Sequence, residues 1–144
     1  MSGVFLHGWG AVSPAGWGSG LMWDALRDRR QIEPQPLPWP GHPDAMLARR
    51  VPAPSPRPAI LAHPRLRRSS PLSQFVVAAA MEALGGMARE ATGPSFRLGI
   101  VCSIFTGCIG YSRRFYGEVL RDPSTASPIV FPETVFNAPA SHLG

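Results

Sequence analysis

The most regular hydrophobic pattern in the chain lies between residues 71 and 84. Apolar side chains recur there at helical spacing, as expected of a helix with one buried face; they are Leu72, Phe75, Val76, Ala79, Ala83, Leu84 and, just beyond, Met87. Ser70 is a favourable N-cap, Pro71 suits the first helical position, and Gly85-Gly86 provides a stop. The pattern predicts a buried helix over these residues.

Three weaker patterns predict further helices. Leu21, Met22, Trp23, Ala25 and Leu26 favour a helix that begins at Ser19, whose hydroxyl can cap the free amides. A polar helix is expected from about residue 113 to 121, and a short helix in the final residues. The carboxylates of Asp24, Asp28, Glu82 and Glu90 are interpreted as solvated helix positions.

Two apolar segments have the composition of strands. Val4-Phe5-Leu6 leads into a glycine-rich bend that ends at Ser13-Pro14, and residues 97–102 run Arg-Leu-Gly-Ile-Val-Cys. Branched and aromatic residues suit a pleated sheet, while Gly8 and Gly10 permit close packing. Cys102, inside the second segment, is expected to be buried and unreactive.

The segment from about residue 34 to 64 interrupts this alternation. It contains ten prolines, which remove backbone donors and restrict the backbone, so neither a helix nor a central strand is expected. We predict an extended proline-rich surface loop within a single domain of residues 1–144. Because helices and strands alternate around that loop, the fold class is α/β, with helices covering strands.

Composition narrows the function classes. The net charge is +5 and all 14 basic residues are arginine, so the field favours acidic partners. The arginines are scattered without a nucleic-acid motif, and no apolar run is long enough to cross a bilayer. We therefore expect neither a nucleic-acid nor a membrane partner, and a cytoplasmic location. Two cysteines are too few for a disulfide framework or a zinc site, so no metal or cofactor is expected.

Several stretches together resemble β-ketoacyl-(acyl carrier protein) synthases, the condensing enzymes of fatty-acid and polyketide assembly. They are the opening Gly-x-Gly segment with its Ser-Pro turn, Ser-Gln-Phe-x-x-Ala-Ala-Ala-x-Glu-Ala-Leu at residues 73–84, Gly-Ile-Val at 99–101, and Asn-x-x-Ala-x-His-Leu at 137–143. The resemblance implies an incomplete N-terminal half of the thiolase-like fold, a layered α/β/α arrangement. It also implies an acyl carrier protein as partner, and a homodimer or a heterodimer with a ketosynthase.

The resemblance assigns roles to a few residues. Phe105, Thr106 and Cys108 correspond to the wall and base of the acyl pocket, although Thr106 replaces the usual apolar residue. Asn137 and His142 correspond to non-catalytic positions near the dimer interface, where they hydrogen-bond to loops. The basic run Arg65, Arg67 and Arg68 is either a docking site for the carrier protein or a solvated cluster.

In this family the nucleophilic cysteine follows the Asn-x-x-Ala-x-His-Leu stretch, so these residues are expected to carry no catalytic residue. Two alternatives stay open. The chain is either part of a condensing enzyme or a non-catalytic partner that resembles chain-length factors. A third reading makes Cys108, between Gly107 and Gly110, a nucleophile in a glycine-flanked elbow.

Overall fold

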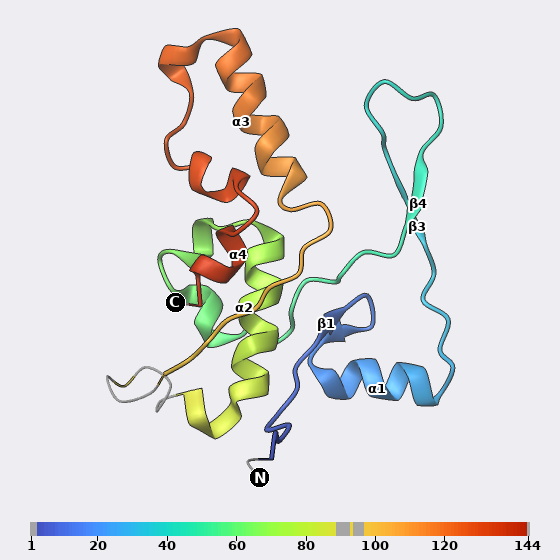
Figure 1. The fold of residues 1–144 in the computed structure, drawn as a ribbon. Helices are drawn as coiled ribbons and strands as arrows, with labels where there is room; N and C mark the ends of the chain where they lie inside the picture. The colour runs from blue at the N-terminus through green and yellow to red at the C-terminus, as the bar shows by residue number, and fades with distance from the viewer. Residues whose placement is uncertain (1–2, 89–92, 94–96, 144) are drawn as a thin grey trace.

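The computed structural model describes residues 3–88, 93 and 97–143. Its central element is helix α2, Pro71–Leu84, against which the N-terminal and C-terminal parts of the chain pack (Figure 1). The Ser70 hydroxyl accepts a hydrogen bond from the Ser73 amide, and Gly85 ends the helix with a φ of 51°. The predicted bounds and caps of this helix are confirmed. Its burial is less complete than predicted, because only Ser73 and Val77 are fully buried.

The N-terminal part is a tight hairpin followed by a helix. Strands β1, Val12–Ser13, and β2, Gly16–Trp17, pair antiparallel, and α1 spans Ser19–Arg27. The Trp17 ring meets Phe75 of α2 edge-on, with ring centroids 5.4 Å apart. The predicted helix is confirmed, but Ser19 does not cap it. Gly18 occupies the N-cap, and the Ser19 amide and hydroxyl both donate to a carboxylate of α2, described below.

The segment before β1 lies unusually close to the backbone of α2. A Cβ added at Gly8 would lie 2.0 Å from the Ala83 carbonyl oxygen, and one at Gly10 would lie 2.0 Å from the Ala79 carbonyl oxygen. Real side chains never approach backbone oxygens so closely. Glycine at both positions therefore allows this contact, as the small alanines of α2 do from the other side.

The two longer strands expected from the sequence are not formed. Residues 4–6 and 97–102 have no strand assignment, and the sheets of the described residues are two short antiparallel pairs. Val4 and Val101 are fully exposed, and Cys102 is also exposed rather than buried. The reason is that a strand needs a neighbour for its backbone groups, and these segments lie beside none. The structure is thus a mixed helical and sheet protein, without the predicted layered sheet among the described residues.

The first half of the proline-rich segment forms a two-stranded hairpin with short strands that projects from the body of the molecule (Figure 1). Strands β3, Gln35–Leu37, and β4, Met46–Ala48, pair antiparallel, so an isolated ribbon accommodates prolines that a central strand would not. Two 3₁₀ turns follow it and return the chain to α2; they are η1, Ala59–Ala62, and η2, Leu66–Arg68.

The C-terminal part covers the first half of α2. Helix α3 spans Ile109–Arg121 and begins four residues earlier than expected, and α4 is the short helix Ala138–Ser141. Between and before them lie three 3₁₀ turns: η3, Gly85–Ala88; η4, Pro123–Thr125; and η5, Phe131–Thr134. Phe115 of α3 packs on Phe131 of η5 with ring centroids 5.3 Å apart. Among the described residues, no helix combines the length and apolarity needed to traverse a bilayer.

Candidate functional site

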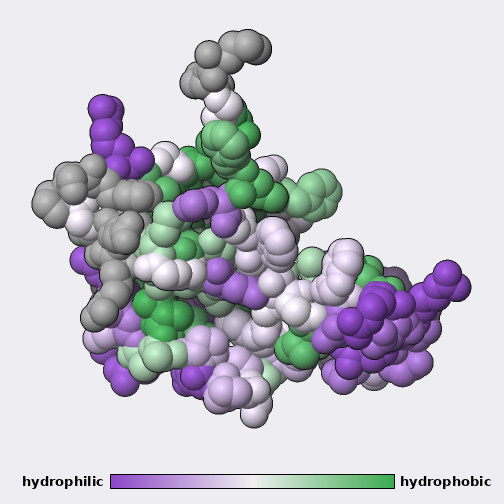
Figure 2. Space-filling model, turned by 90° about the horizontal axis from the view of Figure 1, so that it is seen from below, coloured by the Kyte–Doolittle hydropathy of each residue, from purple (hydrophilic) through white to green (hydrophobic). Residues whose placement is uncertain are grey.

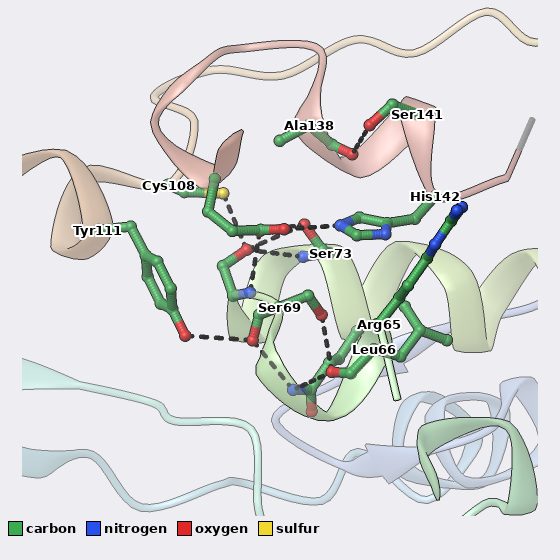
Figure 3. A network of polar contacts seen from close by, with 12 residues as sticks. Arg65, Leu66, Ser69, Ser73, Cys108, Tyr111, Ala138, Ser141 and His142 are labelled. Carbon is green, nitrogen blue, oxygen red and sulfur yellow. Dashed lines mark hydrogen bonds and ion pairs between the residues drawn. The ribbon is translucent and has the colours of Figure 1, made fainter. Parts of the chain in front are cut away.

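A buried polar cluster joins the start of α2 to η5. Glu133 is only 4% exposed, and its Oε2 accepts hydrogen bonds from the Ser70 amide at 2.9 Å and the Ser73 hydroxyl at 2.8 Å (Figure 3). Ser70 and Ser73 are themselves buried. The carboxylate therefore accepts hydrogen bonds from two buried donors, the Ser70 amide and the Ser73 hydroxyl. It lies at the N-terminus of α2, where negative charge is favoured.

The cluster continues from Ser70 to Cys108, the residue that directly precedes α3. The Ser70 hydroxyl donates to the Ser73 hydroxyl at 3.0 Å, and the Ser73 hydroxyl donates to the ionised Glu133, which can only accept. Ser70 Oγ also lies 2.9 Å from Cys108 Sγ, so the Cys108 side chain is buried against the start of α2.

At the other end of the cluster, His142 pairs with the second carboxylate oxygen. His142 Nε2 lies 2.6 Å from Glu133 Oε1, and its side chain is 18% exposed. Burial raises the pKa of Glu133, but the hydrogen bonds from His142, Ser70 and Ser73 outweigh it, so the pKa lies below its ordinary value. Glu133 is therefore ionised at neutral pH and fixes the orientation of the imidazole.

A cavity of about 570 Å³ lies beside this cluster, between α2, α4 and the extended residues 98–101. His142 and Arg65 belong to its wall. The rest of the lining is mostly aliphatic; it includes Ile60, Leu66, Val77, Met81, Leu84, Leu98, Ile100 and Leu143. Figure 2 shows hydrophobic residues gathered in the middle of the underside of the molecule instead of being enclosed within it.

The structure separates the residues that the resemblance assigns to an acyl pocket. Phe105 is 99% exposed and Thr106 is exposed, whereas Cys108 is buried against Ser70. None of these three residues lines the cavity of about 570 Å³. Asn137 is exposed, and its side chain makes no capping bond to α4.

The basic run lies at η2, directly before α2. Arg65, Arg67 and Arg68 are all exposed, and only Arg65 belongs to the cavity lining. Within the described ranges, none of the three forms a salt bridge. They are therefore accessible to an anionic ligand.

Two carboxylates have contacts that the local sequence pattern does not predict. Glu82 is an exposed position of α2, as expected, and it also accepts from the Ala11 amide at 3.0 Å and from the Ser19 amide and hydroxyl, both at 2.7 Å. Burial raises its pKa, but these bonds outweigh the effect and leave it below the ordinary value. Glu133 was not singled out, although a lone acidic residue among Val130, Phe131 and Val135 is a signal for a buried, hydrogen-bonded charge. Glu90 lies outside the described residues.

Comparisons of the chain with protein-family models, curated proteins and solved structures give no significant match. The resemblance to condensing enzymes therefore depends on the quoted sequence stretches alone. Within residues 3–88, 93 and 97–143, no three His, Cys, Asp or Glu side chains gather closely enough to hold a metal ion. The site combines the hydrogen-bonded Glu133 carboxylate and His142 imidazole with the Arg65 guanidinium, beside a cavity lined mainly by aliphatic side chains.

Proposed function

We propose that this chain supplies the N-terminal scaffold of a β-ketoacyl synthase-like condensing protein for fatty-acid or polyketide assembly, with the thiolase-like fold as its architecture. The observation that carries the proposal is that the separate stretches bearing the resemblance contact one another. Gly8 and Gly10 lie on the alanines of α2, and Glu133 joins the start of α2 to His142.

The exposed extended segments also support this proposal. Val4, Phe5 and Leu6 are at least 82% exposed, and residues 98–101 are extended with Val101 fully exposed. Apolar residues in extended segments without strand neighbours are suited to join a larger sheet. In the proposed protein, these two segments become strands when the remaining part of the condensing fold, or a partner, lies beside them.

The second candidate is a non-catalytic partner of a ketosynthase, resembling chain-length factors. The observation in its favour is the state of the two cysteines. Cys108 is buried with its Sγ 2.9 Å from the Ser70 hydroxyl, and Cys102 is exposed. Within the described residues, neither cysteine is hydrogen-bonded to a His, Asp or Glu side chain that would act as the base of a nucleophilic thiolate. Both candidates place an acyl carrier protein among the partners, with Arg65, Arg67 and Arg68 as its docking residues.

The test combines the purified chain with a ketosynthase and an acylated carrier protein. Native mass spectrometry is expected to detect a complex with the ketosynthase or the carrier protein, while the chain alone acquires no acyl group. A change in product chain length on adding the chain would support the non-catalytic partner. Acylation of Cys108 by the chain alone would contradict both candidates, as would failure to bind either protein.

A further inference from the structure

The cavity beside His142 is separate from the residues that the proposed function assigns to an acyl pocket. Its volume of about 570 Å³ falls within the roughly 300–1,000 Å³ of small-molecule sites. The apolar part of its lining is aliphatic and includes Leu66, Val77 and Ile100, and no Phe, Tyr or Trp side chain belongs to the described lining. Such a wall suits a flexible alkyl chain better than a flat ring.

Three nitrogen-bearing side chains line the cavity: His63, Arg65 and His142. Figure 3 draws two of them, Arg65 and His142, beside the polar cluster. His142 Nε2 is already bonded to Glu133 at 2.6 Å, so the opposite ring edge, with Nδ1, is the part left for a ligand. Among the described residues, Arg65 has no carboxylate partner.

We propose that this cavity binds an aliphatic carboxylate of medium chain length. The alkyl chain lies along Leu66, Val77 and Ile100, and the carboxylate receives hydrogen bonds from the Arg65 guanidinium and from His142 Nδ1. Bonding to Glu133 and to the ligand at once requires a proton on each nitrogen of the His142 ring, because both carboxylates only accept hydrogen bonds. The net charge of +5 adds a favourable long-range field for an anion. This site does not depend on the condensing function.

Isothermal titration calorimetry, in which decanoate is added to the full chain, tests the site. Saturable binding at one site is expected, and octanoate should bind roughly 15-fold more weakly, because each buried methylene changes Kd about fourfold. Decanol, which has the same chain and no charge, should bind at least tenfold more weakly than decanoate. Equal binding of decanol and decanoate would overturn the assignment of the charged group.

Two variants and one matched control complete the test. Arg65→Gln should weaken decanoate binding by about tenfold or more, because it removes a charged donor. Arg67→Gln removes the same charge from the same turn but not from the cavity, and should change Kd by less than about twofold. Equal losses in both variants would mean unspecific attraction and would overturn the proposal. Met81→Trp, which adds an indole ring to the cavity wall, should weaken binding by about tenfold or more.

A protein segment is the competing occupant of this groove. Sedimentation velocity on the same samples distinguishes it from a small ligand. A stable dimer that excludes decanoate and that Met81→Trp dissociates would assign the groove to a second copy of the chain, and would overturn the proposal. A lack of saturable decanoate binding to the wild-type chain would do the same.

Discussion

Replacement of Glu133 provides the most stringent test of the buried polar cluster. In Glu133→Ala the Ser70 amide and the Ser73 hydroxyl lose their acceptor inside the protein, while His142 can still reach water. Each orphaned buried donor costs about 1–3 kcal/mol, and the cost is larger where the lost partner is charged, as Glu133 is. We therefore expect a loss of about 3–5 kcal/mol in the free energy of unfolding at pH 7.

Glu133→Gln is the milder variant and keeps the measurement possible if the alanine variant does not fold. Its amide oxygen still accepts from the two serines, and only the negative charge is lost, so the expected cost is about 1–2 kcal/mol. Urea unfolding followed by far-ultraviolet circular dichroism gives these values. The control is Glu33→Ala, an exposed glutamate of the proline-rich segment, which should stay within about 0.5 kcal/mol of wild type. A Glu133→Ala protein within 1 kcal/mol of wild type would refute the cluster as a stabilising unit.

The same residue predicts a pH dependence. The pKa of Glu133 is lower in the folded protein than its ordinary value, so its contribution to stability is fully present above the unfolded pKa of about 4.3. That contribution is lost as the pH falls through the lower, folded pKa. The stability difference between wild type and Glu133→Gln should therefore shrink below about pH 4. A difference that stays constant between pH 7 and pH 3 would contradict the ionised state.

Two further predictions concern packing and exposure. Gly10→Ala should lower the melting temperature, because its Cβ would collide with the Ala79 carbonyl at 2.0 Å and such overpacking costs about 1–3 kcal/mol. Gly20→Ala, in open space on α1, should raise it by removing up to about 1 kcal/mol of helix penalty; effects of the same sign would refute the packing argument. Iodoacetamide should modify the exposed Cys102 in the folded protein and Cys108 only after unfolding, as read by peptide mass mapping. Equal labelling rates at the two thiols would disprove the burial of Cys108.

Features encoded by neighbouring residues were predictable from the sequence. The bounds of α2 follow from Ser70, Pro71 and Gly85, each of which acts within one turn of the helix. The strands expected at 4–6 and 97–102 failed for the opposite reason, because pairing depends on segments distant in the sequence. A local apolar pattern indicates that a segment can form a strand, but it does not show whether another strand lies beside it.

The polar cluster could not be predicted for the same reason. Ser70 and Glu133 are 63 positions apart, and no local pattern links them. His142 was expected to make a structural hydrogen bond, but its partner was not identified. A signal was nevertheless present, since a Ser-x-x-Ser start to a helix leaves donors that a distant carboxylate can accept. The fold and function implied by the resemblance stay proposals.

The bare apolar segments at residues 4–6 and 98–101 have a consequence for biosynthesis. Exposed apolar segments of this kind promote aggregation when many copies of the chain are synthesised together. If the proposed condensing partner covers these segments, a cell that makes this polypeptide benefits from producing both at the same time and place. Before these segments are covered, we expect molecular chaperones that bind exposed hydrophobic segments to bind the nascent chain.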